Sequence, residues 1–310
     1  MRTTRPAGGA SRVGALRSVC ALGLAFAVIP LSGCLFTRRK LPMPKPPAVT
    51  QTAAAADLVK QLNDRWNSLN TLYAKVNIQL TTTKAKDGVK VETGYTSFPG
   101  IIMMRKPEML RVYGQYPVFQ SPLFDMASDG TTFTLYVHPP KNIAYTGPAT
   151  LTHKSSNMIE NLRPGFFLDA LLVRGLDPDN EYMRMTDTDT VEDVKRKHLL
   201  LVPEYILTVM RGKPDSQERK PVRVIHFHRE DLRPYQQDIY DEQGNLETQV
   251  IYGAYTDFGG SLYPSTVTIK RPLEEFQIVM TVDKVTENSD LKDDQFHIKI
   301  PPGVKVQTLQ

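Results

Sequence analysis

The residues with the clearest chemical potential stand near the N-terminus, where a cysteine follows a short apolar run. Residues 19–29 are apolar, and the arginines that precede them are Arg2, Arg5, Arg12 and Arg17. The run leads into Leu31-Ser32-Gly33-Cys34. A basic segment, a short apolar segment and small residues before a cleavage point are typical of a secretory signal peptide. Cleavage here would fall directly before Cys34.

The segment Leu31–Cys34 resembles the bacterial lipobox, in which the cysteine sulfur is acylated and the cysteine becomes the new N-terminus. This resemblance implies a lipoprotein signal peptide at residues 1–33 and several acyl chains, of the palmitate type, on Cys34. The apolar run is shorter than the roughly 20 residues that a transmembrane helix needs, so membrane attachment depends on this lipid. The alternative is an ordinary cleaved signal peptide with an incidental cysteine. We expect no cofactor other than the covalent lipid.

Processing would also remove the thiols and most of the positive charge. Cys20 lies in the segment to be cleaved and Cys34 would carry lipid, which leaves no disulfide, thiol nucleophile or cysteine-ligated zinc. Losing the four arginines takes the formal charge from +5 to +1. Because no basic stripe interleaved with aromatic residues follows, we expect no nucleic-acid partner.

Residues 34–54 are predicted to form a lipidated, proline-rich linker. Proline-rich chain extends by about 3.1 Å per residue and would hold a domain away from the bilayer. Residues 38–40 are basic and would contact anionic lipid head groups.

Hydrophobic periodicity predicts a helix, a series of strands, a second helix and further strands. Apolar residues recur at steps of three and four over 55–72, which indicates an amphipathic helix, and Trp66 is expected in the core. Residues 164–174 are apolar on every side, begin with a proline and precede Gly175, so we predict a buried helix there. Residues 177–196 are charged and predicted to form a loop. The predicted strands are 74–83, 89–98 (with a turn at 87–88), 101–104, 110–113, 133–137, 142–146, 198–202, 205–210, 222–229, 236–240, 248–255, 265–270 and 276–285, before a tail at 296–304.

Consecutive hairpins favour an antiparallel sheet, and a sheet of about a dozen strands must curl or close. The predicted fold class is therefore mainly β with a few helices.

Several constellations were weighed as catalytic or metal sites. His226 and His228 share one face of a strand but lack a third ligand, and nearby arginines disfavour a dication. Residues 187–193 lack the glycine and the fifth-position ligand of a calcium loop. No nucleophile elbow, zinc-binding His-Glu-x-x-His motif or P-loop occurs. We therefore expect no metal site and no enzyme, although distant carboxylates could still meet in a hydrolase.

Three short motifs resemble the LolA/LolB family of lipoprotein carriers and receptors. They are the strand-turn-strand at residues 104–112, the hairpin of residues 128–130 before 134–136, and Phe296 followed by Pro301-Pro302-Gly303-Val304, which resembles the final strand of the family. The resemblance covers most of residues 57–306. It implies an incomplete β-barrel whose helices plug an apolar cavity that accepts acyl chains, here over the domain 55–310.

The resemblance suggests two groups of binding residues. The candidate cavity and lid residues are Trp66, Phe166, Phe167, Leu171 and Leu172, with the 164–174 helix as a lid. A single long acyl chain withdrawn from water contributes on the order of 10 kcal/mol before any costs. The alternative is that these residues simply fill a packed core.

A second group lies in the apolar, proline-broken segment 116–124, at the position of the exposed loop of LolB-type receptors. The candidate membrane-facing residues are Val118, Phe119, Leu123 and Phe124. The alternative is a loop folded back onto the sheet.

The sequence thus predicts a lipid-anchored periplasmic protein that binds lipid or lipoprotein acyl chains in lipoprotein localisation or outer-membrane lipid handling. Leu35 after the lipidated cysteine implies the periplasmic face of the outer membrane under the common sorting rule, with the inner membrane left open. The competing hypothesis is a structural or interaction lipoprotein that grips other envelope proteins and carries no lipid cargo.

Overall fold

The computed structural model describes residues 50–86, 89–150, 163–193, 195, 197–212 and 218–309. The signal peptide, Cys34, residues 34–49 of the linker and the turn at 87–88 lie outside these ranges and stay predictions. Two compact units can be distinguished, one of residues 1–44 with 191–200 and one of residues 45–190 with 201–310. The features below belong to the second unit, apart from the ends of two strands that reach into residues 191–200.

One sheet of 15 strands dominates the chain, and a separate two-stranded ribbon joins β13 to β14. The order is β17-β7-β6-β5-β4-β3-β1-β16-β15-β12-β11-β10-β9-β8, and β2 pairs with the far half of β1. The strands are β1 (Thr71–Lys86), β2 (Val89–Gly94), β3 (Phe98–Arg105), β4 (Met109–Gln115), β5 (Pro122–Ser128), β6 (Thr132–Val137), β7 (Ile143–Pro148), β8 (Glu181–Asp193), β9 (His198–Gly212), β10 (Arg219–His228), β11 (Pro234–Tyr240), β12 (Leu246–Tyr252), β13 (Tyr255–Asp257), β14 (Leu262–Pro264), β15 (Thr266–Arg271), β16 (Phe276–Glu287) and β17 (Lys305–Thr308).

The sheet is apolar on one face because its strands alternate with a period of two. In β1, Leu72, Ala74, Val76 and Ile78 are buried, whereas the residues between them are largely polar. Neighbouring strands repeat the alternation in register, as in the pairing of Ile78 with Met280 of β16. The buried positions of both halves of the sheet join one hydrophobic core.

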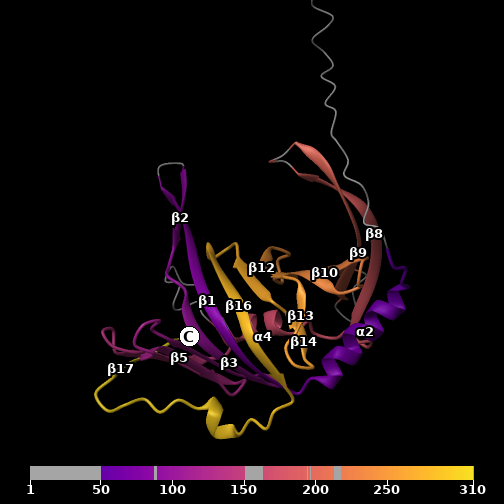
Figure 1. Ribbon diagram of the computed structural model, residues 1–310. Helices are drawn as coiled ribbons and strands as arrows, with labels where there is room; N and C mark the ends of the chain where they lie inside the picture. The colour runs from indigo at the N-terminus through magenta and orange to yellow at the C-terminus, as the bar shows by residue number, and fades with distance from the viewer. Residues whose placement is uncertain are drawn as a thin grey trace, which may run out of the picture. The chain divides into compact units, whose positions relative to one another are not determined.

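The sheet curls around the short helix α4 (Pro164–Leu171), which contacts both β5 and β15. Four strands separate β5 from β15 in the sheet, so one helix can contact both only if the sheet bends around it. Figure 1 shows α4 in the hollow of the curled sheet. The edge strands β17 and β8 do not pair with each other, and the sheet stays open, which confirms the predicted incomplete barrel.

Helix α2 (Ala55–Ser68) packs Leu58 and Leu62 into the same core, as the periodicity predicted. It ends at Ser68 rather than at Leu72, because the following residues pair with two strands. Leu72 lies opposite both Met104 of β3 and Glu287 of β16. The guanidinium of Arg65 donates two hydrogen bonds, of 2.8 and 2.5 Å, to the Glu287 carboxylate and ties the helix to the end of β16.

Helix α4 is also shorter than predicted, since Leu172 and Val173 continue in extended conformation. Side chains from the sheet and from the β13–β14 ribbon bind the carbonyl groups at this end. The Tyr263 hydroxyl donates to the Leu171 carbonyl at 2.7 Å, and Arg223 donates to the Arg174 carbonyl at 2.7 Å. These partners replace the hydrogen bonds that a further helical turn would make.

Two expectations from the sequence were wrong. The charged segment 177–196 is not a loop, because residues 181–193 form β8, an edge strand whose side chains are mostly exposed. Charge is compatible with an edge strand and discourages pairing with other chains. The tail at 296–304 is not a strand either. Phe296 ends the 3₁₀ helix η2 (Asp293–Phe296), and the final strand begins at Lys305 and runs parallel to β7.

The predicted strands 198–202 and 205–210 form the single strand β9. Within the described ranges, no helix is long and apolar enough to cross a bilayer.

The C-terminal segment crosses the outer face of β3 and β4 and covers a small second core. Phe296 is buried there with Met103 and Leu291, on the face of β3 opposite to the main core. The guanidinium of Arg111 joins this segment to the sheet, since it binds both carboxylate oxygens of Asp125, at 2.9 and 2.7 Å, and the carbonyl of Gln295 at 3.0 Å.

We predict that Phe296→Ala lowers the free energy of unfolding by about 3–5 kcal/mol, because it removes a fully buried ring and leaves a cavity. Urea denaturation of the full chain measures the change. Phe119→Ala is the matched control and should change stability by about 0.5 kcal/mol or less, since Phe119 is 83% exposed. Equal effects of the two substitutions would contradict the packing of this segment.

Candidate functional site

The concave face of the sheet and α4 enclose an apolar cavity of about 490 Å³. It is the best-formed apolar hollow among the described residues, and one side opens to solvent. The lining residues are Ile78, Leu80, Tyr95, Thr96, Phe98, Val112, Tyr116, Pro117, Leu123, Phe124, Met126, Leu135, Val137, Lys141, Phe167 and Ile278.

The walls come from inward-facing positions of consecutive strands. Ile78 and Leu80 lie two apart on β1, Phe124 and Met126 on β5, and Leu135 and Val137 on β6. Because side chains two apart on a strand point the same way, each strand contributes a pair of apolar side chains to one surface.

Two aromatic rings shape one wall. Phe98 and Phe124 meet edge to face with their centroids 5.7 Å apart. Gly114 of β4 lies against them, and a Cβ at this position would come within 2.6 Å of the Phe124 ring. A glycine therefore allows both rings to pack closely over β4.

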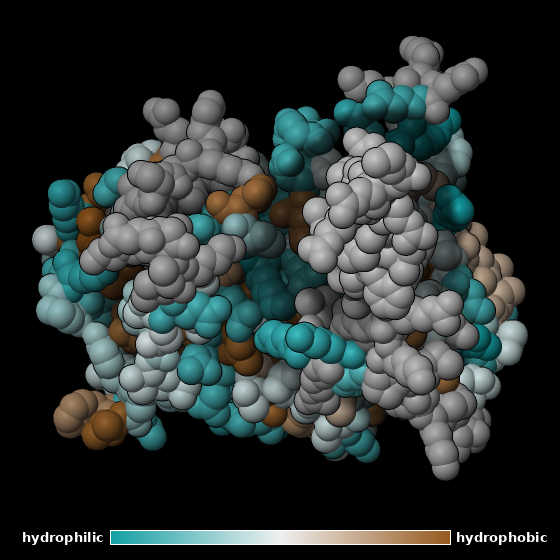
Figure 2. Space-filling view, turned by 90° about the horizontal axis from the view of Figure 1, so that it is seen from above, coloured by the Kyte–Doolittle hydropathy of each residue, from teal (hydrophilic) through white to brown (hydrophobic). Residues whose placement is uncertain are grey.

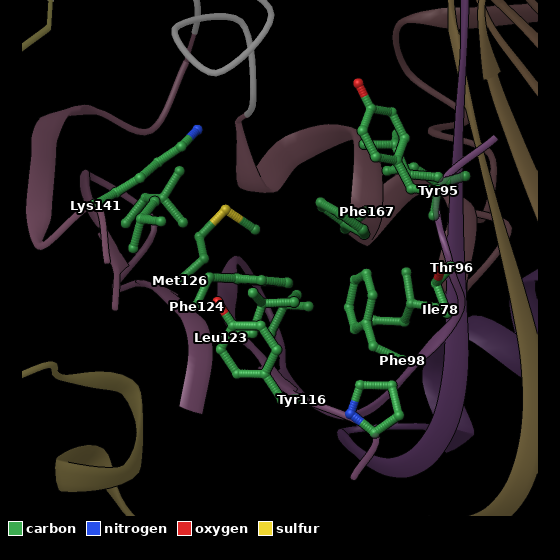
Figure 3. A pocket seen from close by; sticks show the side chains of 16 residues that line it. Ile78, Tyr95, Thr96, Phe98, Tyr116, Leu123, Phe124, Met126, Lys141 and Phe167 are labelled. Atoms are coloured by element: carbon green, nitrogen blue, oxygen red, sulfur yellow. The ribbon is translucent and has the colours of Figure 1, made fainter. Parts of the chain in front are cut away.

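Helix α4 contributes Phe167 to the cavity. Figure 3 shows its ring pointing into the hollow, and Phe167 stacks on Phe166 with a centroid distance of 4.3 Å. Phe166 itself packs against Phe276, 6.0 Å away, on the core side.

The other predicted cavity and lid residues lie elsewhere. Leu171 and Leu172 border a separate hollow of about 330 Å³ near α2 and the β13–β14 ribbon. Trp66 does not line the apolar cavity. Trp66 is half-buried. The Lys106 ammonium and the Arg174 guanidinium lie over its ring, 4.7 Å and 5.8 Å from the ring centroid.

The predicted membrane-facing residues fall into two pairs, one in the loop between β4 and β5 and one at the start of β5. Val118 and Phe119 at the tip of the loop are 81% and 83% exposed, the highest values among the large hydrophobic residues described. Leu123 and Phe124 instead point into the cavity. Figure 2 shows a protrusion of hydrophobic side chains at the lower left of a largely hydrophilic surface. Tyr116 and Pro117 line the cavity, so this loop connects the cavity to the exposed tip.

Few polar groups line the cavity. Among the described lining residues, Lys141, in the turn after β6, is the only charged one, and the hydroxyl groups belong to Tyr95, Thr96 and Tyr116. Lys141, Tyr95 and Thr96 are exposed at the mouth, whereas Figure 3 shows Tyr116 on the side of the hollow away from the Lys141 amine and the Tyr95 hydroxyl. In Figure 3 the Lys141 amine and the Tyr95 hydroxyl stand on opposite sides of the hollow, and both point upward. Lys141, Tyr95 and Thr96 were not predicted from the sequence. An isolated polar residue between two strands shows no pattern that would indicate which cavity it lines.

The histidine pair belongs to a polar network on the outer face of the sheet. His226 Nδ1 lies 2.9 Å from a Glu204 oxygen that also accepts a hydrogen bond from the Tyr235 hydroxyl, and the His228 ring stacks on Tyr235 at 4.0 Å. Burial raises the pKa of the Glu204 carboxyl, but the hydrogen bonds from His226 and Tyr235 outweigh it and the net pKa is lowered. In the part of the chain that the structure describes, no three metal-ligating side chains gather into a site.

A second large hollow, of about 820 Å³, is polar and charged. One of its buried groups is Arg223, which pairs with Glu181 at 2.9 Å and donates to the carbonyl groups of Arg174 and Gly175. Burial lowers the pKa of the Arg223 guanidinium, and the Glu181 carboxylate opposes that shift. Through these contacts Arg223 supports the segment that follows α4.

Comparison with known proteins finds similarity at the level of structure only. No protein-family model matches the chain, and no curated protein sequence matches it. Among solved structures, a LolA superfamily protein from Nitrosomonas europaea is 13% identical, with a TM-score of 0.46 over 81% of this chain and 99% of that one. An outer membrane lipoprotein-sorting protein domain from Vibrio parahaemolyticus is 10% identical, with a TM-score of 0.46 over 77% and 94% of the two chains.

A DUF1329 family protein from Desulfovibrio piger is 15% identical, with a TM-score of 0.41 over 78% and 95% of the two chains. The structures found thus include LolA superfamily and lipoprotein-sorting proteins, the family that the sequence motifs resemble. These likenesses concern the fold, and no residue role is taken from them.

Proposed function

We propose that this chain is a membrane-anchored, non-enzymatic protein of the cell envelope that binds an acyl chain of a lipid or lipoprotein in the apolar cavity. The observation that supports it is the cavity itself, whose walls are almost entirely hydrocarbon and aromatic rings. Its volume of about 490 Å³ falls in the range of about 300–1,000 Å³ typical of small-ligand sites.

The energetics favour an acyl chain as the occupant. Each methylene transferred from water to an apolar surrounding contributes about 0.8 kcal/mol. An empty apolar cavity instead leaves its lining without packing partners, which costs stability. The fold keeps such a cavity open beside a well-packed core, which supports a binding role for it.

The chemistry of the lining supports binding rather than catalysis. Its polar side chains are an amine and hydroxyl groups, and the lining residues include neither a carboxylate nor an imidazole. General acid–base catalysis most often uses a histidine or a carboxylate within hydrogen-bond reach of the substrate, although a lysine or a tyrosine can also serve.

Anchoring and location belong to the same proposal. The lipobox-like segment supports a lipid on Cys34, and the linker 34–54 would tether the domain to the periplasmic face of the outer membrane. An interaction scaffold without lipid cargo is the outcome if the cavity binds nothing.

We expect Leu80→Trp to weaken acyl-chain binding at least tenfold, because the indole would occupy part of the cavity. Gln79→Trp is the matched control, since its neighbouring position on β1 is exposed on the opposite face, and it should bind normally. Equilibrium binding of radiolabelled monopalmitoylglycerol to the full chain measures both.

This probe is uncharged and reports on the cavity alone. Val137→Phe provides a second, smaller filling of the cavity if Leu80→Trp fails to fold. Undiminished binding by both folded cavity variants, or no binding by the wild-type chain, would reject the cavity as the acyl-chain site.

We further propose that the exposed tip of the β4–β5 loop inserts into the bilayer surface. A large apolar side chain gains about 1.5–3 kcal/mol when it is fully buried, so Val118 and Phe119 together favour such contact. Because Tyr116 and Pro117 line the cavity, insertion of the tip would bring the cavity close to the membrane.

A tryptophan reporter tests the loop. The chain has a single tryptophan, so Phe119→Trp in a Trp66→Phe background places the only indole at the tip. In vesicles containing brominated phospholipid, we expect quenching and a blue shift of its emission. The control is Leu262→Trp in the same background, at a 41% exposed site on β14, which should show neither change. Unquenched emission from position 119 would contradict insertion.

A further inference from the structure

We propose that the cavity selects an amphiphile with one acyl chain and an anionic head group, and that Lys141 binds that head group at the mouth. The proposal rests on the proposed function and names the ligand class of the same site. It follows from the kind, number and placement of the polar groups around an otherwise apolar hollow.

The mouth carries donors and one positive charge. A lysine ammonium offers three hydrogen-bond donors and no acceptor, and the Tyr95 and Thr96 hydroxyls can donate as well. No acidic side chain is among the described lining residues, and Lys141 forms no ion pair with any residue that the structure describes. Such a mouth complements a group that is rich in acceptors and negatively charged, namely a carboxylate or a phosphate.

The position of Lys141 is fixed by the turn that bears it. Val137, the last residue of β6, lines the cavity, and Lys141 follows four residues later. Asn142 next to it has a φ of 48° and accepts a 2.8 Å hydrogen bond from the hydroxyl of the buried Tyr136. This bond holds the turn against β6 and keeps the lysine at the opening.

The opposite side of the mouth is fixed in a similar way. The Tyr95 N–H donates a 2.9 Å hydrogen bond to the Leu80 carbonyl, which anchors the residue beside the middle of β1. Figure 3 shows the Tyr95 ring across the hollow from Lys141, with its hydroxyl and the lysine amine pointing the same way. An acyl chain in the hollow would therefore leave its head group between two polar side chains.

The size of the cavity indicates one chain. Its volume of about 490 Å³ lies in the lower half of the range of about 300–1,000 Å³ typical of small-ligand sites, which suits a single fatty acyl chain. A free fatty acid and a lysophospholipid both satisfy this requirement.

The test compares ligands that share an acyl chain and differ in the head group. Palmitate carries a carboxylate, palmitoyl-lysophosphatidylglycerol a phosphate, and monopalmitoylglycerol no charge. We expect the full chain to bind at least one of the two anions at least tenfold more tightly than the uncharged ligand. Lys141→Met should abolish this preference, and Lys141→Arg should restore it.

Lys75→Met is the matched control, because Lys75 is exposed on the outer face of β1. It should keep the preference of the wild-type chain. A preference for palmitate alone, for the lysophospholipid alone or for both identifies the carboxylate, the phosphate or any anion as the recognised group.

Equal affinities for charged and uncharged ligands in the wild-type chain, or a preference that survives Lys141→Met, would overturn the role of Lys141. If the wild-type chain binds none of the three ligands, monopalmitoylglycerol included, the proposed function itself is rejected.

Discussion

The structure depends on one mismatch of size: the apolar concave face of the sheet is larger than the helix that covers it. Helix α4 has only eight residues, yet the sheet bends around it so that it contacts both β5 and β15. Its aromatic and aliphatic side chains fill the centre of the concavity. Beyond Phe167, no helix of the described residues packs against the inward-facing residues of β1, β5 and β6, and the cavity is the space that remains between them.

The two faces of the sheet differ in chemistry because the side chains of a strand point alternately to one face and to the other. The inner face is apolar and can hold hydrocarbon. The outer face carries the polar contacts that stiffen the sheet, such as the Arg111–Asp125 ion pair and the network of Glu204, His226 and Tyr235. The C-terminal segment adds a second small core on that face around Phe296. Rigidity on the outside allows the inside to stay incompletely filled.

Local patterns in the sequence predicted the class of fold and most of its elements. Alternation along β1 and the all-apolar character of α4 are local properties, and they led to a curled sheet around a buried helix. Features set by tertiary pairing were not predictable in this way. Residues 181–193 have the composition of a charged loop but form an edge strand. The helix predicted at 55–72 is one turn shorter, because the residues after it pair with β3 and β16.

The site shows the same division. Phe167 was predicted because it belongs to an apolar helix, and Val118 and Phe119 because they lie in an apolar loop. Leu123 and Phe124 belong to the same apolar segment but face inward, since they follow the start of β5 at Pro122. Lys141 and Tyr95 come together only when β6 and the segment before β3 fold onto opposite sides of one hollow, which no spacing in the sequence encodes.

The account is tested most directly by native mass spectrometry of the full chain released gently from its own envelope, with extraction and identification of any bound lipid. Apart from the lipid proposed on Cys34, we expect a species heavier by the mass of one single-chain, anionic amphiphile per protein. A mass without any such adduct, unchanged after incubation with palmitate or lysophospholipid, would contradict the claim that the cavity binds an acyl chain.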